Sequence, residues 1–112
     1  LTGPMASVSK AVEYIYANMA EAISVDQLAD MSGFSISSLE RYFKKHFGSG
    51  PGRFVLQVKI SRACELLADP SYSIASVGEK LGYRDPVVFS RAFKREMRMN
   101  PTSYRKSLKL IG

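Results

Sequence analysis

The sequence predicts an all-α fold in which seven helices form two helix-turn-helix lobes joined by a long central helix. Apolar residues recur every three or four positions along most of the chain, which is the spacing of one face of a helix. The segment from Ser24 to Phe54 is repeated imperfectly from Ser73 to Tyr104, and each copy has the pattern of a helix, a glycine turn and a second helix. No segment shows the alternating pattern of a half-buried strand.

With 112 residues, of which 46% are apolar, the chain can bury a core but is short for two independent ones. Residues 1–6 are expected to be a cloning remnant or linker, 7–51 the first lobe, 52–69 the linker helix and 70–112 the second lobe. The sequence does not begin with methionine, so we expect a C-terminal fragment of a longer protein.

The first predicted helix covers residues 8–20 and precedes the repeat. Its apolar residues are spaced as one face of an amphipathic helix: Val8, Ala11, Val12, Ile15, Tyr16 and Met19.

The first copy of the repeat begins with a capping box, formed by Ser24 and Gln27. Gly33 is expected to take the left-handed backbone conformation that ends a helix, and Ser35 to cap the next helix, at about 35–47. The apolar stripe of the short first helix consists of Val25, Leu28, Ala29 and Met31.

In the second copy Gly82 makes the turn. Asp85 caps the following helix, at about 86–97, and Pro86 occupies its first position, where a missing N–H costs nothing. The preceding helix is capped by Ser73 and carries Ile74, Val77 and Leu81.

Two further helices complete the predicted fold. Residues 52–68 form the long helix between the copies, which Asp69-Pro70 closes, and its apolar residues are Phe54, Val55, Val58, Ala63, Leu66 and Leu67. A last short helix starts at Pro101 and carries Tyr104 and Leu108.

A helical wheel at 100° per residue divides the second helix of each copy into two faces. In helix 35–47 the predicted inner stripe is Ile36, Leu39, Tyr42, Phe43, His46 and Phe47. The outer face holds Ser37, Arg41 and Lys44, flanked by Ser38, Glu40 and Lys45. In helix 86–97 the predicted inner arc is Phe89, Ala92, Phe93, Glu96 and Met97. The outer arc is Val87, Arg91 and Lys94, with Val88 and Arg95 on one flank and Ser90 on the other. Val88 is expected on the part of its flank that lies near the core.

Charge is distributed unevenly along the chain. Residues 1–40 hold one lysine and five acids, whereas residues 41–112 hold fifteen Lys and Arg and five acids, and the net charge is +6. A basic region of this kind attracts polyanions, of which nucleic acid is the commonest, although a high isoelectric point alone is equally typical of ordinary proteins. The recurrence of basic side chains at matched positions in the two copies favours DNA.

These residues resemble the DNA-binding domain of the AraC/XylS-type bacterial transcription regulators, over roughly residues 8–106. The segments that carry the resemblance are Leu28-Ala29, Gly33-Phe34-Ser35, 39–45, 48–51, Arg62-Ala63, Leu66-Leu67, Gly82-Tyr83, 89–95 and 101–105. The resemblance implies a monomeric grip on asymmetric DNA, with recognition helices in successive major grooves. It also implies a bacterial, cytoplasmic, nucleoid-associated transcription factor that works with RNA polymerase and is usually joined to an N-terminal effector and dimerisation domain.

The resemblance assigns roles to individual residues. Base-reading is expected of Ser37, Ser38, Glu40, Arg41, Arg84, Val87, Ser90 and Arg91. Phosphate contacts are expected of Ser24, Lys44, Lys45, Ser73, Lys94, Arg95 and Arg98. Three positions depart from the family pattern: Arg98 and Asn100 replace a usual glycine and serine, and Gly78 replaces a usual alanine, which weakens that helix by roughly 1 kcal/mol and suggests a looser second lobe.

No cofactor, metal site or enzymatic activity is expected. Cys64 and His46 are the only residues of their type; Cys64 is expected to be a small core residue, and His46 a packing residue or a neighbour of a phosphate. No nucleophile, base and orienting group come together in the sequence, and no apolar run approaches the length of a membrane span. The alternative to DNA binding is a basic helical interaction module for an acidic partner, such as a polymerase subunit. The sequence does not indicate the operator, the effector signal, or activation against repression.

Overall fold

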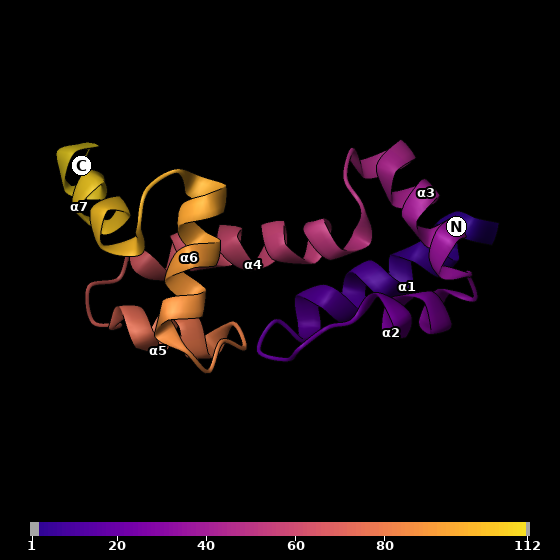
Figure 1. Cartoon of the computed structure of the whole chain (residues 1–112), viewed down its shortest axis with the longest axis horizontal. Helices are drawn as coiled ribbons and strands as arrows, with labels where there is room; N and C mark the ends of the chain where they lie inside the picture. The colour runs from indigo at the N-terminus through magenta and orange to yellow at the C-terminus, as the bar shows by residue number, and fades with distance from the viewer. Residues whose placement is uncertain (1–2, 112) are drawn as a thin grey trace. The chain divides into compact units, whose positions relative to one another are not determined.

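The computed structural model describes residues 3–111, which contain seven helices and no strand (Figure 1). The helices are α1 (Gly3–Ala17), α2 (Val25–Ser32), α3 (Ile36–Phe47), α4 (Pro51–Leu67), α5 (Ile74–Lys80), α6 (Pro86–Met97) and α7 (Pro101–Ile111). The predicted all-α class is confirmed. The chain divides into two units, Leu1–Val58 and Lys59–Gly112, and the division falls inside α4.

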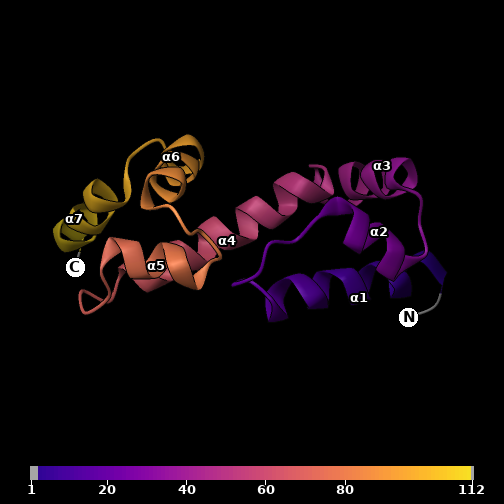
Figure 2. The ribbon, with the colours of Figure 1, turned by 60° about the horizontal axis from the view of Figure 1, so that its bottom comes forward.

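In the first unit, α2 packs between α1 and α3, and Figures 1 and 2 both show α2 running beside α1. The buried core consists of Val8, Ala11, Ile15, Leu28, Ala29, Leu39, Phe43, Val55 and Val58. Four helices contribute to this core, so the first part of α4 is needed to cover the helix-turn-helix.

The bounds of α1 differ from the prediction of residues 8–20. The helix begins at Gly3, with Pro4 in the first turn, where proline is tolerated, and the Tyr42 hydroxyl lies 3.4 Å from the Met5 sulfur. Residues 3–6, which the sequence suggested to be a remnant or linker, are therefore part of α1. At the other end Asn18 leaves the helix, and its side chain donates to the Tyr14 carbonyl at 2.9 Å.

Side-chain caps begin α2 and α3 as predicted. The Gln27 N–H donates to the Ser24 hydroxyl at 3.1 Å, and the Ser24 N–H donates to the Gln27 side-chain oxygen at 2.9 Å, which completes the capping box. Gly33 has a φ of +69°, and the Phe34 N–H bonds back to the Ala29 carbonyl at 3.0 Å. These bonds satisfy backbone groups that a helix end would otherwise leave unpaired, and they set the angle at which α3 leaves α2.

The second unit combines the rest of α4 with α5, α6 and α7, and α6 packs against both α5 and α7. Its buried apolar residues are Ile60, Ala63, Leu67, Val77, Leu81, Phe89 and Phe93. The Phe93 ring lies between those of Phe89, at 6.0 Å, and Tyr104 of α7, at 5.5 Å. Each such buried phenyl ring contributes roughly 1.5–3 kcal/mol, so the two phenylalanines of α6 anchor it to the unit.

Gly78 of α5 has a packing role that the sequence did not reveal. A Cβ atom placed on it would lie 3.0 Å from the ring of Phe89, which is fully buried. The glycine therefore permits the close approach of α5 and α6. Glycine lowers the helix propensity of α5, but an alanine at this position would crowd the Phe89 ring.

Arg105 of α7 ties three carbonyl groups together. Its guanidinium donates to the carbonyl oxygens of Leu67 at 2.9 Å, Tyr72 at 2.7 Å and Asp69 at 3.3 Å. Leu67 is the last residue of α4, so its carbonyl has no partner within the helix. The bonds join α7 to the loop between α4 and α5.

The apolar stripes predicted from the sequence placed several residues too far inside. Ile36 is 44% exposed, Phe47 41% and Met31 36%, and His46 is also exposed. Ile36, Met31, His46 and Phe47 all lie within the first or last turn of their helices, where the neighbouring elements no longer cover the inner face. Phe47 still stacks on Phe43, with ring centres 4.9 Å apart, and His46 on Tyr42 at 4.2 Å.

The residue Cys64 is half-buried in α4. Burial raises the pKa of its thiol, and a hydrogen bond with Tyr104 opposes that rise in pKa. Among residues 3–111 no helix combines the length and apolarity needed to cross a bilayer.

Candidate nucleic-acid interface

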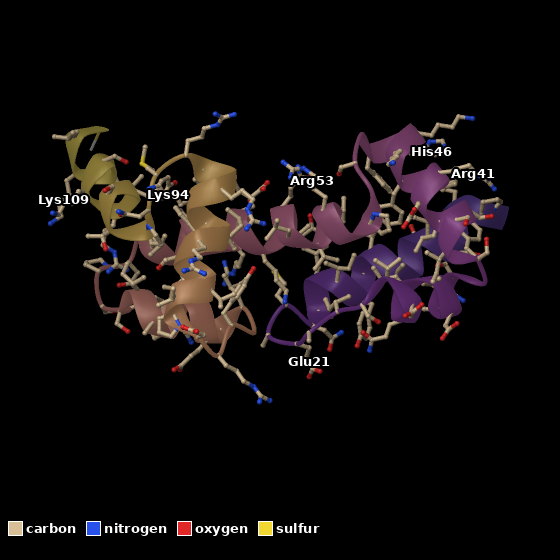
Figure 3. All side chains as sticks on the ribbon, viewed as in Figure 1. Glu21, Arg41, His46, Arg53, Lys94 and Lys109 are labelled. Atoms are coloured by element: carbon tan, nitrogen blue, oxygen red, sulfur yellow. The ribbon has the colours of Figure 1, made fainter. Side chains whose placement is uncertain are left out.

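The outer face of α3 is polar over its whole length after Ile36. Leu39 and Phe43 are fully buried, whereas Arg41, on the other side of the helix, projects away from the ribbon (Figure 3). The predicted outer residues Ser37, Glu40, Arg41, Lys44 and Lys45 are all exposed, and Ser38 is half-buried. The fold thus brings the whole predicted α3 set to one surface.

A chain of hydrogen bonds connects the start of α3 to Arg41. The hydroxyl of Ser35, the cap, accepts from the Ser38 N–H at 3.1 Å and donates to the Ser38 hydroxyl at 2.9 Å. The Arg41 guanidinium donates to the same Ser38 hydroxyl at 3.3 Å. Ser38 thus connects the cap of α3 to the Arg41 head group on the helix surface.

The outer face of α6 differs from that of α3 in carrying apolar side chains. The Asp85 carboxylate accepts from the Val87 N–H at 2.8 Å, which fixes the first turn. Val87 is 54% exposed and Val88 49%. The prediction that Val88 lies near the core is therefore wrong: both valines belong to the first turn, which extends beyond the residues that cover Phe89.

The remaining predicted residues, from α6 and the turn before it, also reach the surface. Arg84, Arg91, Lys94 and Arg95 are exposed, and Ser90 is half-buried. Lys94 is labelled on α6 in Figure 3. A hollow of about 310 Å³ is lined by Pro86, Val87, Ser90, Arg91, Lys94 and Asn100. Asn100, from the turn after α6, thus lies beside the predicted residues, where the sequence did not place it.

The predicted phosphate contacts Ser24 and Ser73 are exposed, and both hydroxyls already serve as caps. The Ser73 hydroxyl accepts from the Ser76 N–H at 3.0 Å, and Ser24 accepts from Gln27. Accepting such a bond leaves each hydroxyl its own hydrogen to donate. Each serine can therefore cap its helix and donate a hydrogen bond to an anion at the same time.

Arg98 follows α6 in the left-handed conformation, with φ of +63°. Among the residues described it is the one non-glycine residue with positive φ, and its N–H donates to the Lys94 carbonyl at 2.8 Å. The matching position after α3 is Gly48, with φ of +80° and the same bond, to Lys44, at 3.1 Å. The backbone turn is thus the same in the two copies although the residue is not, and Arg98, unlike Gly48, adds an exposed positive charge after its helix.

A family model described as a helix-turn-helix domain matches residues 28–107, which include most of both copies of the repeat. An HTH-type transcriptional regulator from Haemophilus influenzae is 33% identical over 86 residues, 77% of this chain and 29% of that protein. The lactose operon transcription activator of Staphylococcus xylosus is 29% identical over 98 residues, 88% of this chain and 35% of the activator. The chain spans about a third of the length of these curated relatives.

Two solved structures have the same fold. A transcriptional regulator with an AraC-type DNA-binding domain, from Chromobacterium violaceum, is 30% identical with a TM-score of 0.81, and the match covers 91% of each chain. The DNA-binding domain of AdpA, in complex with a target DNA, is 25% identical with a TM-score of 0.85, and the match covers 97% of this chain and 96% of that one.

Proposed function

The chain belongs to the AraC-type family of DNA-binding transcription regulators, and from this premise we propose that α3 and α6 are its recognition helices. One observation carries the proposal. Arg41 with Lys44 and Lys45 on α3, and Arg91 with Lys94 and Arg95 on α6, occupy matched positions of the repeat and are all exposed. Each helix enters a major groove, which is about 12 Å wide, and the two grooves are successive on one duplex.

The side chains at the centre of each outer face contact the bases. Arg41 and Arg91 have the reach and the two parallel N–H groups to bind guanine O6 and N7 together. The other base-reading residues are Ser37, Ser38 and Glu40 from α3, and Arg84, Val87 and Ser90 from the start of α6 and the turn before it.

The phosphate contacts surround these centres. The long basic side chains reach the backbone at the groove edges and contribute affinity without sequence preference. They are Lys44, Lys45, Lys94, Arg95 and Arg98, joined by the hydroxyls of Ser24 and Ser73.

Val87 gives the second helix an apolar contact that the first lacks, because the matching residue of α3 is Ser37. Its exposed methyl groups suit the 5-methyl group of thymine, the apolar feature of the major groove. We expect a thymine beside the base that Arg91 reads.

The whole protein is proposed to act in the bacterial cytoplasm at the nucleoid, with RNA polymerase as partner and an N-terminal effector and dimerisation domain. No catalytic role is assigned to the chain, because its family acts by binding DNA. The proposed N-terminal domain is supported by the curated relatives, of whose length this chain spans about a third.

Selection from a library of random duplexes tests the proposal. An enriched motif with two separate half-sites is expected, and its absence would favour the alternative, binding of an acidic protein partner. On the selected site Arg41→Ala and Arg91→Ala should each lose about 1–3 kcal/mol and relax the preference at one base pair. Lys45→Ala is the control, because a phosphate contact should weaken cognate and random duplexes alike.

Uracil substitution tests the thymine contact. Replacing the thymine by uracil removes only the methyl group, so it should weaken the wild-type chain and leave Val87→Ala unaffected. Equal losses in both proteins would refute the contact.

A further inference from the structure

The hollow on α6 is an open depression lined by both apolar and basic side chains. It measures about 310 Å³, near the lower end of the range for ligand sites, and all its lining residues belong to the second unit. Five of them come from α6, and the sixth, Asn100, comes from the turn that follows it.

The floor of the hollow is apolar. Val87 is more than half exposed, and Pro86 lies beside it in the first turn of α6. The methylene stems of Arg91 and Lys94 extend the apolar surface, since such stems cover neighbouring carbon while the charged ends remain in water. A flat hydrocarbon ring would therefore lose water-exposed surface on entering.

The rim of the hollow is positively charged. Arg91 and Lys94 are exposed, and the described part of the chain gives neither of them an ion pair with a carboxylate. The Asn100 side-chain oxygen accepts from the Ser103 N–H at 2.8 Å, which leaves the amide nitrogen as its donor. All these groups offer N–H to a ligand, so an anion is favoured over a cation.

We propose that this hollow binds a small planar organic anion, with its ring on Val87 and Pro86 and its carboxylate between Arg91 and Lys94. A carboxylate can receive two parallel bonds from a guanidinium, and the adjacent ammonium adds a third contact. The matching place on α3 lacks the valine, because Ser37 stands where α6 has Val87.

Occupation of the hollow excludes DNA from α6. Val87, Ser90 and Arg91 cannot contact a base and the anion at the same time, so the ligand is a competitive antagonist of the second recognition helix. This consequence rests on the proposed function, whereas binding of the anion itself does not.

The binding test uses 2-naphthoate and its uncharged counterpart of the same shape, 2-naphthamide. Titration of the ¹⁵N-labelled chain should shift the amide signals of Val87 and Ser90 in a saturable way, and the naphthamide should bind about tenfold more weakly. Val87→Ser and Arg91→Met should each weaken naphthoate binding by a similar factor. Arg41→Met, the matched change on α3, should not alter it.

Two results would overturn the anion site: equal binding of the two probes, or equal losses in Arg41→Met and Arg91→Met, which would indicate charge attraction without a site. Because both variants replace exposed side chains, their folding is checked by their melting temperatures. A failed titration with well-folded protein thus counts against the proposal.

A second measurement separates this inference from the proposed function. Naphthoate should raise the apparent Kd for the selected duplex in proportion to the occupancy of the hollow. A site that binds naphthoate without any effect on DNA would overturn the antagonism and the placement of α6 in the groove. DNA binding without naphthoate binding would overturn the anion site alone.

Discussion

Replacing Arg98 by glycine should make the second unit more stable and its grip on DNA weaker. Arg98 has φ of +63° and ψ of +14°, a conformation that costs a side chain other than glycine roughly 1–2 kcal/mol. Glycine removes that cost but loses about 0.5–1 kcal/mol more backbone entropy on folding. The N–H bond to the Lys94 carbonyl is retained, so a net gain of roughly 0.5–1 kcal/mol is expected, which corresponds to a rise in Tm of about 2–4 °C.

Two further variants distinguish the effect of relieving backbone strain at residue 98 from the effect of removing its charge. Arg98→Ala removes the same charge but keeps a Cβ atom in the left-handed conformation, so it should melt below Arg98→Gly. In the first unit Gly48→Ala should lower stability by roughly 0.5–1 kcal/mol, because the strain that the same turn then acquires exceeds the backbone entropy that alanine saves. Differential scanning calorimetry of the four proteins gives the comparison, and an Arg98→Gly variant no more stable than Arg98→Ala would refute the backbone argument.

Affinity for DNA responds to the charge alone. If Arg98 neutralises one phosphate, the slope of log K against log salt should fall by about 0.9 in both the glycine and the alanine variant. Unchanged slopes would remove Arg98 from the phosphate contacts and leave the stability prediction intact.

Two further predictions concern the second unit. Arg105→Ala should lower the free energy of urea unfolding by about 2–3 kcal/mol, since three carbonyl oxygens lose a charged donor. The control Lys106→Ala should change it by less than about 0.5 kcal/mol. Similar values for the two variants would show that the Arg105 bonds to the three carbonyls do not stabilise the unit. Gly78→Ala should destabilise the unit by about 1 kcal/mol, because crowding against the Phe89 ring exceeds the gain in helix propensity, and a variant that melts higher would show that the ring can move aside.

Features that depend on a few neighbouring residues were predictable from the sequence. The capping box at Ser24, the cap at Ser35 and the cap and proline at Asp85 and Pro86 each have a local chemical cause, and the structure has all of them. The glycine turn at Gly33 belongs with them, because its left-handed backbone follows from the residue type.

Features that depend on distant parts of the chain were missed. A helical wheel assumes that neighbours cover a helix along its entire length, so it buried Ile36 and Phe47, which the structure leaves exposed. The three carbonyls that Arg105 holds are more than thirty residues away in sequence, and no local pattern announces them. Asn100 joins the hollow on α6 only through the turn that Arg98 makes.

The bonds around Ser38 also limit which base edges this side chain can contact. A hydroxyl group has two positions that accept a hydrogen bond and one hydrogen to donate. While Ser35 and Arg41 both donate to it, the accepting positions of Ser38 are occupied, and only its hydrogen is left to point outward. In this state Ser38 can meet guanine O6, purine N7 or thymine O4, but it has nothing to offer the amino groups of adenine and cytosine. As long as both bonds are kept, a side chain that could otherwise serve either kind of base edge serves one.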